Sequence, residues 1–425
     1  MIAWFYNLVF ILAAVFYAPY LCVKGKWHKG LVSRLGPVPE EVARFCSSGP
    51  VVWIHAVSVG EVQAVSRFMR LLPSYVPGVK IVLTTVTPTG YQLAASRLGP
   101  DCRLLYAPLD LSWVVRHYVR RIRPRLYVTA ETEIWPNLFM ELAGQNIPVA
   151  IFNGRISNQS FRRYRAVVVL TRQILRHVTL SCVQTREDAD RMCRLGAPAD
   201  RVHVLGNVKF DEASLEEGYA RDRVGYDGQD DIWVAGSTHP GEEDIILRCF
   251  TALRKKFPHL KLILAPRHVA RASEICSLVE AYGWRPTLWS RQREGRLEKE
   301  AVLVVDTIGH LRKLYALATV VFVGKSLVGK GGQNIIEPAA YGKPVIVGPA
   351  MDNFERVVEV FKNAQAIVQI HGPEELEEAL RSLLEDSDRR TALGLRARAV
   401  VLAQQGATEQ SLALISPLLA KYYKY

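Results

Sequence analysis

Short apolar runs alternate along most of this 425-residue chain with segments long enough to form helices. Such alternation predicts strand–helix–strand units, in which a crossover helix lets neighbouring strands pair in parallel. The runs fall into two series, separated by a polar stretch at residues 213–230. We therefore predict an α/β protein with two doubly wound domains. Strands are expected at 51–55, 80–84, 103–106, 125–129, 148–152 and 180–183, and then at 232–235, 261–265, 302–305, 320–323, 344–347 and 366–368.

The length and composition agree with two packed domains. A chain of 425 residues exceeds what one hydrophobic core usually covers, and 49% hydrophobic with 22% charged residues excludes disorder. We place the first domain at 24–212 and the second at 213–425, and the last helix is a candidate for packing back on the first domain. The seven cysteines are scattered and form no C-x-x-C pair, so we predict reduced thiols and no zinc site.

The segment 324–348 carries the strongest single signal for ligand binding. An apolar run at 320–323 is followed by a loop with three glycines, then by a short helix carrying Asn334 and Glu337. In an open parallel sheet, ligands lie beyond the carboxyl ends of the strands, where helix amino termini present free N–H groups. A carboxylate one turn into that helix can accept hydrogen bonds from a ribose diol. The second domain is therefore predicted to hold a nucleotide, although the loop is not a P-loop because no Ser or Thr follows Lys330.

Positive charge is concentrated in the first half of the chain. Residues 1–212 contain 26 Lys and Arg against 14 Asp and Glu, a net charge of +12, whereas residues 213–425 contain 28 against 27, a net charge of +1. This asymmetry indicates an anionic partner for the first half, either a nucleic acid or an acidic membrane surface.

The first 23 residues favour the membrane. The 22 residues from Ile2 to Val23 carry no charge, and about 30 Å of helix would cross the hydrocarbon core. Basic residues follow at once, which by the positive-inside rule places the rest in the cytoplasm. We therefore predict a membrane anchor at 1–23. A cleaved signal peptide is disfavoured because no basic residue precedes the run. Pro19 and Asn7 leave a shallow interfacial helix as an alternative.

Two glutamates follow predicted strands of the first domain. Glu61 falls in the first turn of a helix after 51–55, where it either complements the helix dipole, worth about 0.3–1 kcal/mol, or deprotonates an acceptor hydroxyl as general base. Glu131 follows 125–129, where it either steadies positive charge on a sugar ring or is a structural carboxylate. The segment 84–90 either holds a substrate anion with its N–H groups or is a capped helix start.

Further polar groups follow strands near the domain junction and in the second domain. Lys209 lies at the junction, where a lysine is either solvated or faces the ligands. Arg267 follows 261–265, where a guanidinium can bind a phosphate. The segment 308–310 can wrap a base or a ribose. Taken together, these groups predict an enzyme rather than a structural protein.

These residues lie within a series of motifs that resembles one known family. The chain resembles the Kdo transferases of lipopolysaccharide biosynthesis (3-deoxy-D-manno-octulosonic acid transferases), over nearly its whole length. The resemblance implies a GT-B glycosyltransferase fold, with two Rossmann-like domains facing a central cleft. The motifs are His55–Glu61, Thr84–Gly90, Glu131–Asn137, Asn153–Ser157, Gly206–Asp211, Gly236–Glu242, Ala265–His268 and Gly331–Pro338.

The resemblance implies an inverting transfer of Kdo from CMP-Kdo to a hydroxyl of the lipid A precursor (lipid IVA), without a metal or a cofactor. It implies that Glu61 is the general base and that Glu131 and Lys209 stabilise the transition state. The family commonly has Met-Gly-Glu where this chain has residues 308–310, so a backbone contact is expected there and a side-chain role for His310 stays open. The groups implied to hold CMP are Pro266, Arg267, Ile308, Gly309, His310, Asn334, Ile335, Ile336 and Glu337.

The implied partners account for the charge of the first domain. An anionic lipid acceptor at the inner-membrane surface requires a basic face, to which each Lys or Arg can contribute about 1 kcal/mol. Arg162, Arg163 and Arg165 are candidates for it. The sequence leaves two alternatives: a GT-B transferase that uses a UDP-sugar and a lipid acceptor, and a non-catalytic, membrane-tethered nucleotide or nucleic-acid binder. We expect no nucleic-acid partner because aromatic residues do not interleave with the basic ones.

Overall fold

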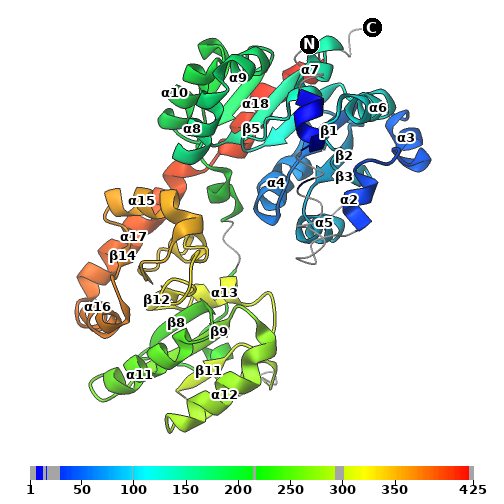
Figure 1. Cartoon of the computed structure of the whole chain (residues 1–425). Helices are drawn as coiled ribbons and strands as arrows, with labels where there is room; N and C mark the ends of the chain where they lie inside the picture. Colours follow the sequence, from blue (N-terminus) through cyan, green and yellow to red (C-terminus); the bar gives the residue numbers. More distant parts are fainter. Residues whose placement is uncertain are drawn as a thin grey trace. The chain divides into compact units, whose positions relative to one another are not determined.

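The computed structural model describes residues 6–12, 16, 29–97, 99–213, 217–291 and 301–420, and it divides into two compact units (Figure 1). Unit 1 contains the chain up to Glu212 together with the segment from Gln405 onward, and unit 2 contains Ala213–Gln404. The helix α18 (Ala407–Ala420, red in Figure 1) therefore belongs to unit 1, although it follows unit 2 in the sequence.

Unit 1 is built on a parallel sheet in the order β3-β2-β1-β4-β5-β6-β7. Both faces of the sheet are covered, and for this reason β1 and β4 read as continuous apolar runs. The strands are β1 (Val51–His55), β2 (Lys80–Thr85), β3 (Cys102–Tyr106), β4 (Leu126–Ala130), β5 (Val149–Gly154), β6 (Leu180–Val183) and β7 (Val202–Val204).

Two apolar cores lie on opposite faces of this sheet. One contains Trp53 with residues of α6 and α7, and the other contains Ile54 with residues of α4 and α18. The helical elements of unit 1 are α2 (Lys29–Ser33), α3 (Glu40–Cys46), α4 (Val59–Tyr75), α5 (Pro88–Ala95), α6 (Ser112–Ile122), α7 (Pro136–Gly144), α8 (Asn158–Ala166), α9 (Val168–Leu175), α10 (Arg186–Leu195), η1 (Ala199–Arg201) and η2 (Val208–Glu212).

Asp211 joins η2 to the start of α18. Its carboxylate is buried and accepts the N–H groups of Gly406 and Thr408, both at 2.6 Å. These N–H groups belong to the first turn of a helix, which has no intrahelical partner for them. Leu412, Ile415 and Leu419 then bury the apolar face of α18 against the core that α4 also covers.

Unit 2 repeats the architecture with the order β10-β11-β9-β8-β12-β13-β14, all parallel. The strands are β8 (Asp231–Thr238), β9 (Leu260–Pro266), β10 (Pro286–Leu288), β11 (Val302–Val304), β12 (Val320–Val323), β13 (Val345–Val347) and β14 (Val368–Gln369). The helical elements are η3 (Asp222–Val224), α11 (Glu242–Arg254), η4 (Val269–Arg271), α12 (Ala272–Ala281), η5 (Trp289–Arg291), α13 (Leu311–Tyr315), α14 (Ile336–Ala340), η6 (Asp352–Phe354), α15 (Glu355–Asn363), η7 (Pro373–Glu375), α16 (Leu376–Glu385) and α17 (Ser387–Gln404).

The anchor helix predicted at 1–23 is not supported. Only residues 6–12 and 16 of it are described, and within the described part of the chain no helix is long and apolar enough to cross a membrane. Residues 6–12 are helical and contact unit 1: Asn7 donates to Ser112 Oγ (2.8 Å) and accepts from Asn137 Nδ2 (2.8 Å), and Phe10 packs on the core. Asn7 is one of the two residues that favoured a shallow interfacial helix over a membrane-spanning one. Its side-chain amide fixes this helix to the domain. The rest of 1–23 lies outside the described residues.

Candidate functional site

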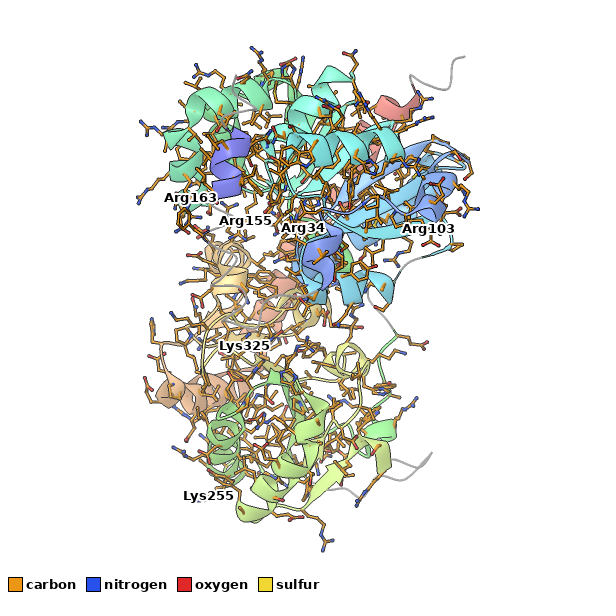
Figure 2. All side chains as sticks on the ribbon, turned by 45° about the vertical axis from the view of Figure 1, so that its right-hand side comes forward. Arg34, Arg103, Arg155, Arg163, Lys255 and Lys325 are labelled. Atoms are coloured by element: carbon orange, nitrogen blue, oxygen red, sulfur yellow. The ribbon has the colours of Figure 1, made fainter. Side chains whose placement is uncertain are left out.

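The candidate acids and cations of unit 1 follow the carboxyl ends of neighbouring strands. Glu61 comes after β1, Glu131 after β4 and Arg155 after β5, and these three strands are adjacent in the sheet. Because parallel strands end at the same edge, the side chains share one edge of unit 1. Arg34 joins that edge through a 2.8 Å hydrogen bond from its Nε to the carbonyl of Ala107, which follows β3. Figure 2 shows Arg34 and Arg155 on the same side of unit 1.

Glu61 is a buried carboxyl group held in a fixed orientation. Its Oε2 accepts the Val57 N–H at 2.8 Å and its Oε1 accepts the Ser58 hydroxyl at 3.0 Å, and the residue is 7% exposed. Burial raises the pKa of Glu61 to about 7, assisted by the charges of Glu131 and Glu133 and opposed by the two hydrogen bonds. A carboxylate with a pKa near neutrality is suited to accept a proton near neutral pH.

The segment that carries Glu131 is held in a conformation that non-glycine residues rarely adopt. Glu131 has a φ of 53°, and such positions cost about 1–3 kcal/mol unless the surroundings fix them. Its N–H donates to the Phe152 carbonyl at 2.9 Å. The next residue, Thr132, accepts the Arg155 N–H on its hydroxyl (3.1 Å) and the Tyr164 hydroxyl on its carbonyl (3.1 Å). These contacts hold the strained backbone of the segment in place.

Glu133 is a second acid of this segment to which the sequence assigned no role. Burial, with the charge of Glu131 as a smaller cause, raises the pKa of Glu133 to about 7. The Glu-x-Glu spacing was the available signal for it. The charges of Glu131 and Glu133 thus add to the effect of burial in raising the pKa of Glu61.

Lys209 lies within the same electrostatic environment. Burial lowers the pKa of Lys209, the charge of Glu131 opposes that shift and the charge of Arg155 adds to it. The backbone of η2 is fixed by two asparagines, because Asn153 Oδ1 accepts the Val208 N–H (3.3 Å) and Asn207 Oδ1 accepts the Lys209 N–H (3.1 Å). The structure thus brings Lys209 and Glu131 together in unit 1.

The segment Thr84–Gly90 is a capped helix start. The N–H groups of Val86 and Thr87 both lie 3.2 Å from the Val57 carbonyl, and Thr87 Oγ1 accepts the Gly90 N–H at 3.1 Å. The N–H groups of Val86, Thr87 and Gly90 are therefore bonded within the protein, and the segment forms the capped helix start that was one of the two interpretations of the sequence. A Cβ at Gly90 would approach Thr87 Oγ1 to 2.8 Å. The segment supports Val57, the residue whose N–H orients Glu61.

In unit 2 the groups expected to hold CMP surround the starts of α13 and α14 and the end of β9. Arg267 follows β9 and is exposed, with its N–H donated to the Thr238 carbonyl at 3.0 Å. Asn334 Oδ1 accepts the Ile336 N–H at 3.0 Å, and Glu337 Oε1 accepts from Arg312 at 3.0 Å. The side chains of Ile335 and Ile336 are buried, so their contribution to a ligand is limited to the backbone.

The segment 308–310 divides into an exposed part and an anchored part. Ile308 is 85% exposed and Gly309 has a φ of 95°, which leaves their backbone accessible. The His310 side chain instead lies 2.7 Å from the Tyr219 hydroxyl through Nδ1, and its ring centroid is 5.0 Å from that of Trp289. The His310 side chain therefore packs against residues of its own unit.

Glu242 is a site residue for which the sequence predicted no role. Its fully buried carboxylate accepts the N–H of His239 (2.9 Å) and a run of three N–H groups after β12. These belong to Lys325 (2.7 Å), Ser326 (3.0 Å) and Leu327 (3.0 Å). One carboxylate therefore fixes the loops that follow β8 and β12. The three partners after β12 lie more than 80 residues away in the chain, a separation that no local pattern reveals.

The remaining predictions concern the surface and metals. Arg162, Arg163 and Arg165 are exposed on α8, a helix none of whose residues is buried. Within the described residues, His, Cys, Asp and Glu form no cluster of three or more that could hold a metal ion.

Both units of the chain match known protein families. Residues 29–212 match the family described as "3-Deoxy-D-manno-octulosonic-acid transferase (kdotransferase)", and residues 244–400 match "Glycosyl transferases group 1". The chain is 32% identical to the 3-deoxy-D-manno-octulosonic acid transferase of Haemophilus influenzae, over 88% of this chain and 89% of that protein. It is 33% identical to the transferase of the same name from Bordetella pertussis, over 85% of this chain and 86% of that protein.

Solved structures show the same fold at low sequence identity. MurG from Acinetobacter baumannii superposes with a TM-score of 0.58 at 13% identity, covering 87% of this chain and 99% of its own. A UDP-N-acetylglucosamine 2-epimerase described as putative, from Listeria monocytogenes, gives a TM-score of 0.57 at 11% identity, with 88% and 97% covered. The predicted GT-B-type architecture of two parallel-sheet α/β domains is thereby confirmed, and likeness at this identity shows the fold alone.

Proposed function

The chain belongs to the 3-deoxy-D-manno-octulosonic acid transferase family and is a glycosyltransferase, and we propose that it moves Kdo from CMP-Kdo to a hydroxyl of the lipid A precursor. The observation that carries the mechanism is Glu61. It is buried in the first turn of α4, the helix that follows β1, it is fixed by two hydrogen bonds, and its pKa is raised to about 7.

In the proposed reaction the carboxylate of Glu61 takes the proton of the acceptor hydroxyl. The hydroxyl oxygen forms a bond to the anomeric carbon of Kdo as the bond from that carbon to the CMP phosphate oxygen breaks. The bonding electrons leave with CMP, and attack from the opposite face inverts the anomeric centre. General base catalysis of this kind contributes about 10²–10⁴ to the rate.

Fixed charges would stabilise the transition state. Glu131 lies close enough to influence the pKa values of both Glu61 and Lys209, and we assign it to the positive charge that builds on the sugar ring. Lys209 and Arg267 are assigned to the departing phosphate, because preorganised cations act most strongly where charge develops in the transition state. This assignment makes the reaction independent of a metal ion and of any cofactor.

The location of the reaction follows from the acceptor. A lipid with phosphates resides at a membrane surface, and we propose that the protein acts at the cytoplasmic face of the inner membrane. The net charge of +12 on residues 1–212 and the exposed arginines of α8 support an anionic partner for unit 1. Such a surface attracts basic residues with about 1 kcal/mol each.

The direct test is incubation of the full chain with the lipid A precursor and with CMP-Kdo that is generated in place, followed by mass spectrometry of the lipid. The proposal expects a mass increase of one or more Kdo residues and competition by CMP rather than UDP. A lipid that gains a sugar only from a UDP-sugar would refute CMP-Kdo as the donor, and an unmodified lipid would refute the proposed function.

A further inference from the structure

Lys325 occupies a backbone position that suits glycine better than lysine. It follows Gly324 at the end of β12 and has a φ of 56°, in the left-handed region where an L side chain is strained. Several glycines of the same loop, including Gly329 and Gly331, adopt positive φ without this cost. A lysine kept in such a conformation at a binding edge suggests that its ammonium group has a function.

The surrounding hydrogen bonds fix where this lysine stands. The Lys325 N–H donates to Glu242 Oε2 at 2.7 Å, and the Lys325 carbonyl accepts the Gly332 N–H at 3.0 Å. The same Glu242 oxygen accepts the His239 N–H at 2.9 Å. Lys325 and His239 therefore sit side by side, one after β12 and the other after β8, which are neighbouring strands of the sheet.

The charge around this pair is positive. Burial lowers the pKa of His239, and the charges of Lys325, His268 and Arg267 lower it further. Glu243 opposes that shift, but its carboxylate is already bonded to Arg271 at 2.8 Å and to the Thr238 hydroxyl at 2.8 Å. Within the part of the chain that the structure describes, the Lys325 ammonium has no ion-pair partner. This edge of unit 2 can therefore accept more than one anionic group.

We propose that Lys325, with His239 beside it, binds the carboxylate of the donor's sugar acid, separately from the phosphate that is assigned to Arg267. This inference rests on the proposed function. In a CMP-linked 2-keto sugar acid the anomeric carbon carries both the carboxylate and the phosphate ester, so two anions need adjacent cations. A UDP-linked aldose has no such carboxylate. Lys325 is accordingly a specificity-determining residue for the donor.

The test compares two ligands that differ in this carboxylate. Lys325→Asn removes the charge while Asn tolerates positive φ, so the variant should fold with an unchanged or higher melting temperature. We expect the KM for CMP-Kdo to rise about ten- to a hundredfold, as loss of a charged hydrogen bond predicts, while the Kd for CMP changes less than about threefold. Lys325→Arg should recover most of the donor affinity. Lys330→Asn makes the same change at an exposed lysine of the same loop, whereas Lys325 is half-buried, and as the control it should leave both constants unchanged.

Two results would overturn the inference. If Lys325→Asn weakened the binding of CMP and of CMP-Kdo equally, Lys325 would be assigned to the phosphate. If neither the Kd for CMP nor the KM for CMP-Kdo changed, Lys325 would not belong to the donor site. Failure of the proposed function is distinguishable from either, because in that case the unmodified protein transfers no Kdo before any variant is made.

Discussion

Glu61 should give the reaction a characteristic pH dependence. A general base works as the carboxylate, and the raised pKa of about 7 means that this form is lost as the pH falls below 7. We expect kcat/KM to decrease about tenfold per pH unit below 7 and to level off above it. A pH–rate profile of the full chain measures this. A profile that is flat between pH 5.5 and 8 would contradict it.

The midpoint of that profile depends on neighbouring acids as well as on Glu61. Burial is the largest cause of the raised pKa of Glu61, and the charges of Glu131 and Glu133 raise it further. Glu133→Gln removes one negative charge next to Glu61, so the midpoint of the profile should move to lower pH.

At the scale of single residues, the sequence allowed candidates for the chemistry to be named, but not the residues that hold the surrounding backbone in place. Glu61 and Arg267 could be singled out because each follows an apolar strand, and the family resemblance gave them roles. Glu242 and Asp110 could not, because their carboxylates bond to backbone N–H groups that are distant in sequence. Asp110 holds the start of α7 through the N–H groups of Asn137 (3.0 Å) and Leu138 (2.9 Å).

At the scale of elements, α8 is the candidate surface for the acceptor. Its arginines 162, 163 and 165 are exposed. Changing all three to glutamine should raise the KM for the lipid about tenfold or more, since each contributes about 1 kcal/mol near an anionic surface. The Kd for CMP should not change. Vesicle-presented lipid and a CMP titration measure the two constants.

The matched control replaces the same three arginines by lysine, which keeps the charge and should keep most of the lipid use. Equal loss of lipid use and CMP affinity in the glutamine variant would argue against a specific acceptor surface on α8.

The elements that the sequence missed are short edge strands. β7 and β10 have three residues each. β7 is an edge strand of the sheet in unit 1, and β10 is an edge strand of the sheet in unit 2. Neither is fully buried, so neither forms the continuous apolar run that identified the central strands. Each of these strands forms by pairing with its neighbour, β6 for β7 and β11 for β10, and this pairing cannot be predicted from the local sequence.

At the scale of the whole molecule, the return of the chain to unit 1 illustrates a similar limit. The segment from Gln405 belongs to unit 1 because Asp211 binds the first turn of α18 and because Leu412 and Ile415 complete an apolar core. The sequence analysis expected the last helix as a candidate for packing on the first domain, but the contacts that hold it there lie nearly 200 residues apart and could not be named from the sequence.

The assignment of fixed cations to the leaving group predicts that the reaction needs no added metal. Turnover of CMP-Kdo and the lipid acceptor should be the same, within error, in EDTA and in magnesium, since Lys209 and Arg267 are proposed to supply the positive charge. Release of CMP measured under both conditions tests this. A strict magnesium requirement of the chemical step would contradict it.

The most direct test of the account measures Kdo transfer by Glu61→Gln beside Glu41→Gln, an exposed glutamate of α3. Glutamine keeps the size of the side chain but cannot take the acceptor proton. The account predicts that Glu61→Gln loses about 10²–10⁴ in kcat while its affinity for CMP is retained, and that Glu41→Gln behaves as the unmodified protein. Transfer by Glu61→Gln at the unmodified rate would contradict the account.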